Sequence, residues 1–276
     1  MDGWRCYYRV ADYILALEGD DTALVPWANS LYTCAQCTAG DPQRVFRVER
    51  VNGRYSLLEG ARELAVARDW SELFAATEWR LTRALMEGAY ALYQIHAGVV
   101  VFNGRALVLC GRSGAGKTSL TVGLGLRGAA VYGDEVAIVD ADSLRVFSFP
   151  RDLIVRNGTR ALFPQIGQLD LPTWKIFADY RYVPPRGWCE LASLPAPCSG
   201  FIFPQLQRGH CEPSLRRMGP AEAAQRILEQ SFNMAQWGKR GIDLVGQLVE
   251  QCPTWELVFA DAGRAADYVL ASEIER

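Results

Sequence analysis

Eight consecutive residues near the middle of the chain have the types and spacing of a phosphate-binding loop. Residues 111–118 read Gly-Arg-Ser-Gly-Ala-Gly-Lys-Thr and match the pattern G-x-x-x-x-G-K-(S/T). An apolar run precedes them and a helical pattern follows, which is the context that the pattern requires. Glycines let the backbone approach an anion closely, and the N-terminus of the following helix adds partial positive charge. The loop therefore predicts a site for the phosphates of ATP or GTP.

Each position of this loop has an expected task. Backbone N–H groups surround the phosphates, Lys117 reaches the β- and γ-phosphates, and the Thr118 hydroxyl completes the coordination shell of Mg²⁺. The residues expected to contact the nucleotide are Gly111, Ser113, Gly114, Ala115, Gly116, Lys117, Thr118 and Ser119. The alternative is a glycine-rich turn that matches by chance, and the flanking strand and helix argue against it.

Two adjacent carboxylates follow Lys117 by about 17 residues. Asp134 and Glu135 come at the end of a short apolar run, where P-loop proteins carry an acid that supports Mg²⁺. One carboxylate can hold the metal while the other takes a proton from a substrate hydroxyl. The alternative for such a pair is a solvated Gly-Asp-Glu turn. With the loop directly upstream, the pair predicts phosphoryl transfer.

The apolar patterns predict the elements that must position these residues. A strand over 97–102, the turn Asn103-Gly104 and a strand over 105–110 lead into the loop, and a helix follows over 117–126. Further strands are expected at 129–132, 136–139, 144–149, 199–204 and 254–260. Further helices are expected from 220, over 241–251 and over 262–273. We therefore expect an α/β fold around the loop.

The first part of the chain has a different character. Apolar or alternating runs at 13–17, 44–48 and 54–58 predict short strands, and Asn52-Gly53 predicts a tight hairpin. Helical spacing then extends from Trp70 to about Gln94. We expect residues 1–94 to form a small β-rich region with one helix, suited to substrate recognition, and residues 95–276 to form the second domain.

Composition excludes several classes of function. The net charge of −2 gives no global basic field for nucleic acid or an anionic membrane. The N-terminus lacks the apolar stretch of an export signal, and no run approaches a membrane span. Eight cysteines without such a signal indicate reduced thiols, so we expect a cytoplasmic protein. The sequence leaves its oligomeric state open.

Cys34-Ala-Gln-Cys37 has the spacing of half a zinc site or of a redox motif. The further ligands that zinc would need are scattered over Cys189, Cys198, His210 and Cys211. We therefore expect these cysteines to be small, partly buried side chains.

Cations and aromatic residues of the proline-rich middle region have two interpretations. Lys175, Arg181 and Arg186 can approach phosphate from a loop, or they are surface charges. Trp174 and the tyrosines at 180 and 182 can frame a substrate groove, and packing is the preferred interpretation.

A set of motifs between residues 95 and 150 resembles a known family. His96, the strand pair joined at Asn103-Gly104, the loop at 111–118, Arg127-Gly128 and Gly133-Asp134-Glu135 are together similar to the catalytic core of HPr kinase/phosphorylase and its shorter relatives. That family shares its fold with ATP-dependent phosphoenolpyruvate carboxykinases. The resemblance implies a P-loop kinase domain over 95–276 that uses ATP and Mg²⁺.

The resemblance also implies residue roles. Asp134 matches the general base of the family, Glu135 its metal-supporting acid, and His96 a histidine close to the reacting phosphate; Lys117 and Thr118 keep their loop roles. From the residues alone, His96 is equally a core histidine at the start of a buried strand. With these roles, Asp134→Asn is predicted to abolish transfer while leaving nucleotide binding nearly intact.

Departures from the family pattern change which substrate is expected. Arg112 stands where the family has an acid, the downstream acid-Arg-Gly motif is not recognisable, and the first 90 residues differ from the usual N-terminal domain. Short relatives found beside lasso-peptide genes phosphorylate a serine of a precursor peptide. We therefore expect an ATP-dependent kinase acting on a hydroxyl of a peptide or protein. A small-molecule kinase of the same fold and an ATP-switched peptide-binding protein are the alternatives.

Overall fold

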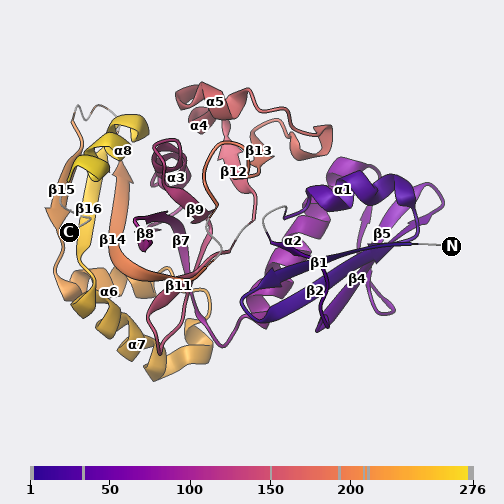
Figure 1. The fold of residues 1–276 in the computed structure, drawn as a ribbon, viewed down its shortest axis with the longest axis horizontal. Coiled ribbons are helices and arrows are strands. Elements are labelled where there is room, and N and C mark those ends of the chain that lie inside the picture. Colours follow the sequence, from indigo (N-terminus) through magenta and orange to yellow (C-terminus); the bar gives the residue numbers. More distant parts are fainter. Residues whose placement is uncertain are drawn as a thin grey trace. The chain divides into compact units, whose positions relative to one another are not determined.

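The structure of the chain is a computed structural model that describes residues 3–32, 35–149, 151–191, 194–207, 209 and 212–272. It is mixed α/β (Figure 1). Contacts divide the chain into two units. The first contains Met1–Ala91, Pro150–Ile154 and Asp170–Pro184, and the second contains Leu92–Phe149, Val155–Leu169 and Pro185–Arg276. Two segments that the sequence analysis placed in the second domain therefore pack with the first.

The first unit contains a six-stranded sheet in the order β3-β1-β2-β4-β5-β6. Its strands are β1 (Trp4–Val10), β2 (Tyr13–Gly19), β3 (Gln36–Cys37), β4 (Arg44–Val51), β5 (Arg54–Glu59) and β6 (Arg62–Ala67). The predicted hairpin at Asn52-Gly53 is confirmed. Val51 pairs with Arg54, and the two turn residues have φ angles of 51° and 78°, as a type I′ turn requires.

Helix α2 (Trp70–Gly88) begins where it was expected and ends earlier. Asp69 caps it by accepting hydrogen bonds from the N–H groups of Ser71 and Glu72. The prediction that the helix continues to about residue 94 is wrong. From Tyr93 onward alternate side chains enter the core of the second unit, so the chain becomes a strand. The shorter elements of this unit are η1 (Thr22–Leu24), α1 (Val25–Ser30), η2 (Thr173–Lys175) and β13 (Tyr180–Val183).

Buried ion pairs join the two later segments to the first unit. Arg151 lies 2.7 Å from the Glu78 carboxylate, and the Lys175 ammonium lies 2.5 Å from that of Asp152, with all four side chains almost fully buried. Lys175 is therefore a core cation rather than a loop residue that approaches phosphate.

The aromatic residues of the same region are also used in packing. Trp174 packs edge-on against Trp70, and Tyr182 packs edge-on against Phe74. These contacts support the packing interpretation over a substrate groove.

The second unit contains an eight-stranded sheet in the order β11-β10-β7-β8-β14-β16-β15, with β9 paired to β7. Its strands are β7 (Tyr93–Phe102), β8 (Arg105–Cys110), β9 (Ala130–Gly133), β10 (Val136–Val139), β11 (Arg145–Phe147), β14 (Ala196–Leu206), β15 (Ser214–Arg217) and β16 (Thr254–Phe259). Strand β12 (Leu153–Arg156) pairs with β13. Because β8, β14 and β16 are parallel, their carboxyl ends lie at one edge of the sheet.

Helices cover both faces of this sheet (Figure 1). Buried residues of β7, from Tyr93 to Val101, share one hydrophobic cluster with α6 (Pro220–Leu228) and α7 (Met234–Gln251). On the opposite face, α3 (Lys117–Gly125) packs against α8 (Ala262–Ala271). Two short helices, α4 (Asn157–Leu162) and α5 (Pro164–Gly167), complete the unit. Helix α7 begins seven residues before its predicted start of 241, with a break at Gly238.

No helix in the described part of the chain has both the length and the hydropathy needed to cross a membrane.

Candidate active site

The predicted phosphate-binding loop connects the end of β8 to the start of α3. Gly114 and Gly116 adopt φ angles of 82° and 99°, a conformation that suits glycine. A Cβ atom on Gly116 would lie only 2.7 Å from the ring of Phe259. The loop therefore needs glycine at residue 116 for its backbone angle and for its close contact with β16.

Replacing Gly116 with alanine is expected to weaken nucleotide binding and to lower the free energy of unfolding by about 1–2 kcal/mol or more, the cost of a left-handed angle plus a clash. Gly128→Ala is the matched control, because Gly128 has a φ of 96° and no atom lies within 4 Å of the place that a Cβ atom would take. Both variants should lose stability in urea titrations, and only Gly116→Ala should lose affinity for a fluorescent ATP analogue. Equal affinities in the two variants would contradict the role of the loop.

Lys117 is buried beneath the first residues of the loop. Its ammonium donates to the carbonyl oxygens of Gly111 and Arg112, at 2.5 and 3.3 Å. Burial lowers the pKa of Lys117, while the negative charge of Glu135 and, more weakly, of Asp134 acts to raise it. The ammonium therefore lies in the field of both predicted acids.

Asp134 lies directly behind the loop. Its Oδ2 atom accepts a hydrogen bond from the Thr118 hydroxyl at 2.8 Å, and the residue is only 3% exposed. Gly98 lets α3 pack closely on β7, since a Cβ atom there would lie 2.6 Å from the Thr121 hydroxyl of α3. The structure thus joins the loop threonine to a carboxylate 16 residues later in the sequence.

Glu135 and His96 form a second, more exposed pair. The His96 Nε2 atom lies 3.4 Å from the Glu135 Oε1 atom, and their side chains are 23% and 39% exposed. The His96 backbone N–H donates to the carbonyl of Gln230 at 2.7 Å. His96 is therefore not enclosed in the core, and the structure groups it with the predicted acids.

The predicted nucleotide contacts Ser113 and Ser119 lie in different surroundings, and the predicted metal ligands share one type of donor atom. Ser113 borders a cavity described below, whereas the Ser119 hydroxyl hydrogen-bonds that of Thr159 at 2.7 Å. A hydroxyl on Thr118 and carboxylates on Asp134 and Glu135 are the hard oxygen ligands that Mg²⁺ prefers, so this donor set fits magnesium. Among the described residues, no group of three His, Cys, Asp or Glu side chains could hold a metal ion by itself.

The cysteine motif is not tested by the structure. Cys34, together with the candidate ligands His210 and Cys211, lies outside the described residues, and Cys37 is a free cysteine.

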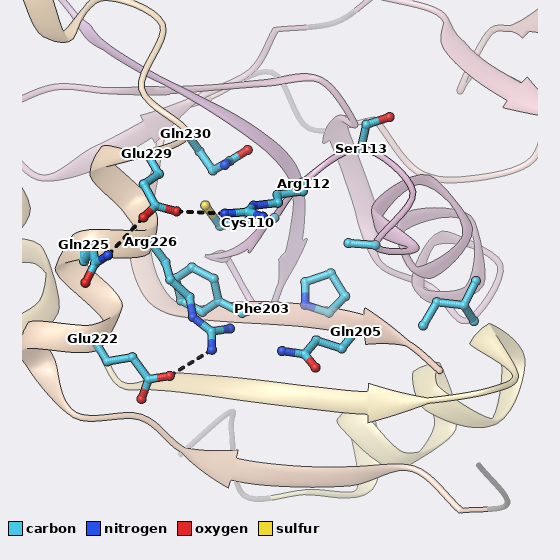
Figure 2. A pocket seen from close by; sticks show the side chains of 14 residues that line it. Cys110, Arg112, Ser113, Phe203, Gln205, Glu222, Gln225, Arg226, Glu229 and Gln230 are labelled. Atoms are coloured by element: carbon cyan, nitrogen blue, oxygen red, sulfur yellow. Dashed lines mark hydrogen bonds and ion pairs between the residues drawn. The ribbon is translucent and has the colours of Figure 1, made fainter. Parts of the chain in front are cut away.

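A cavity of about 580 Å³ opens beside the loop, within the second unit. Figure 2 shows its walls, which are the loop from Cys110 to Ala115, residues 203–206 at the end of β14, and the polar face of α6 with the residues that follow it. Six polar lining residues outside the loop were not predicted from the sequence: Gln205, Glu222, Gln225, Arg226, Glu229 and Gln230. A signal was present: the polar residues of α6 recur every three to four positions and so share one helix face.

Comparisons with known proteins assign no family: the chain matches no protein-family model and no curated protein.

Proposed function

We propose that the protein is a Mg²⁺-dependent kinase that transfers the γ-phosphoryl group of ATP to a hydroxyl group, as on a serine of a peptide or protein. The observation that carries this proposal is the hydrogen bond between Thr118 and buried Asp134. The charges of Asp134 and Glu135 both act on Lys117. In P-loop proteins a loop Ser or Thr and such an aspartate together hold Mg²⁺ next to the phosphates.

The geometry favours one division of labour between the two acids. Asp134 is buried against Thr118, so these two residues would hold the magnesium ion. Bound magnesium neutralises charge on the β- and γ-phosphate oxygens. Glu135 is the more exposed carboxylate, so an incoming hydroxyl can reach it. The assignment drawn from the family resemblance, with Asp134 as base and Glu135 on the metal, is the alternative.

The proposed step uses few groups. The acceptor oxygen attacks the γ-phosphorus, the bond from this phosphorus to the leaving oxygen of ADP breaks, and the hydroxyl proton passes to Glu135. Lys117 neutralises phosphate charge throughout, and His96 positions Glu135. Catalysis then comes mainly from positioning and charge stabilisation.

A small-molecule kinase is the second candidate, and the size of the cavity favours it. About 580 Å³ lies within the range of small-ligand sites. The ATP-switched binding protein is less favoured, because a switch has little need of an exposed carboxylate beside the phosphates.

The proposal is tested by incubating the protein with Mg²⁺ and γ-labelled ATP against proteins including HPr, seryl peptides and a metabolite pool. Label is expected on a hydroxyl of one acceptor, and Lys117→Ala is expected to lower the transfer rate by at least about 10²-fold through lost phosphate stabilisation. Lys239→Ala, which removes an exposed lysine of α7 away from the loop and the cavity, serves as the control. Label in free phosphate alone, or transfer that survives Lys117→Ala at the parent rate, would contradict the proposal.

A further inference from the structure

We infer that the cavity between the loop, the end of β14 and α6 is the acceptor site, and that it takes an uncharged serine residue together with its two flanking peptide groups. This inference rests on the proposed kinase function and adds where the acceptor binds and of which chemical class it is.

The position of Lys117 places the reacting end of the donor next to this cavity. A P-loop lysine reaches the β- and γ-phosphates, and here its ammonium lies against the carbonyls of Gly111 and Arg112. Both of these residues line the cavity. Ser119, at the other end of the loop sequence, does not line it. The γ-phosphate side of the loop, rather than the nucleoside side, therefore faces the cavity.

The same wall is hydrogen-bonded to His96, the residue that lies beside the proposed proton acceptor Glu135. Gln230 lines the cavity, and its backbone carbonyl accepts the hydrogen bond from the N–H of His96. His96 in turn contacts Glu135. The main chain of this wall is thus bonded to that of His96, whose side chain lies beside Glu135, the carboxylate proposed to take the proton.

The charges of the cavity wall are paired with one another. Arg226 donates to Glu222 and to Glu256, at 2.8 Å each, and Arg112 lies 3.7 Å from Glu229. Figure 2 shows the pairs of Arg226 with Glu222 and of Arg112 with Glu229 around the opening. Two lining arginines are balanced by two lining glutamates, so an anionic acceptor would have to compete with carboxylates already in place. The wall therefore favours an uncharged acceptor.

Hydrogen bonds fix the orientation of two lining amides. The Gln225 side chain donates to Glu229 at 3.0 Å, and that of Gln205 donates to Glu256 at 2.5 Å. Because these hydrogen bonds use the amide nitrogens, the carbonyl oxygens can accept N–H groups of a ligand. Phe203 and Pro204 add an apolar surface. Peptide groups supply neutral N–H donors that match this lining.

The test uses Gln225, an exposed residue of α6 whose replacement spares the core. Initial rates are measured with the full chain, Mg²⁺-ATP and N-acetyl-serine-N-methylamide, together with neutral, acidic and basic seryl peptides and with polyols such as glycerol. Gln225→Leu is expected to raise the acceptor KM about five- to tenfold, the equivalent of one hydrogen bond. Gln225→Trp, which places a larger side chain at the opening, is expected to raise the acceptor KM further. The KM for ATP should stay within about twofold in both variants.

Gln247→Leu is the matched control, because Gln247 is an exposed glutamine of α7 outside the cavity, and it should leave both KM values unchanged. An unchanged acceptor KM in both Gln225 variants, or a rise in the KM for ATP instead, overturns the acceptor site while the kinase function stands. Transfer to polyols but to none of the peptides overturns the substrate class. Absence of Lys117-dependent transfer to every probe by the parent protein removes the kinase function, and the inference with it.

Discussion

Asp134→Asn is expected to lower the rate of phosphoryl transfer by about 10²- to 10⁴-fold while leaving nucleotide binding nearly intact. The asparagine oxygen can still accept the hydrogen bond from Thr118, so the loop keeps its shape. The negative charge next to the phosphates is lost. Transfer is measured with labelled ATP, and binding with a fluorescent ATP analogue.

Glu135→Gln, one residue later, is the matched variant that separates the two role assignments. If Asp134 supports the metal, Asp134→Asn should raise the Mg²⁺ concentration needed for half-maximal rate, and Glu135→Gln should lower kcat at an unchanged Mg²⁺ requirement. The opposite pattern would restore the assignment drawn from the family resemblance. Transfer at the parent rate in both variants would remove the acid pair from the mechanism.

Lys175→Met is expected to lower the free energy of unfolding by about 3–5 kcal/mol, the cost of leaving one charge of a buried pair without its partner. Asp152 is fully enclosed, and burial raises the pKa of its carboxyl while the Lys175 charge acts to lower it. Without the ammonium, the carboxylate must be neutralised or exposed. Urea denaturation followed by circular dichroism measures the loss.

The double variant Asp152→Leu/Lys175→Met should recover most of this stability, because it removes both charges. Lys239→Met, at an exposed position of α7, should change the free energy of unfolding by less than about 0.5 kcal/mol. If Lys175→Met were as stable as Lys239→Met, the buried ion pair would not be a source of stability in the first unit.

Features encoded by neighbouring residues could be predicted from the sequence. The loop at 111–118, the turn at Asn52-Gly53 and the elements on either side of each depend on glycine conformation and short-range apolar spacing. The predicted grouping of Asp134 with the loop also agrees with its hydrogen bond to Thr118. This grouping could be predicted because a single strand connects the helix after the loop to Asp134.

Other features depended on contacts between distant residues. Helical spacing continues past Gly88, but from Tyr93 onward the chain is a strand of the sheet in the second unit. In the sequence, Lys175 has the features of a loop cation. Only the folded structure shows that it is buried and paired with Asp152. Tertiary packing overrides local preference where it buries more apolar surface or pairs a charge.

By itself, the sequence determined the glycine-rich loop at 111–118, the two acids and the mixed α/β pattern, since each depends on the spacing of nearby residues. Only the tertiary structure decided which acid is buried against Thr118 and which stays open beside His96. It alone also brought the loop, the end of β14 and α6 together around one cavity. These outcomes depend on how strands and helices far apart in the chain pack, which no local pattern encodes.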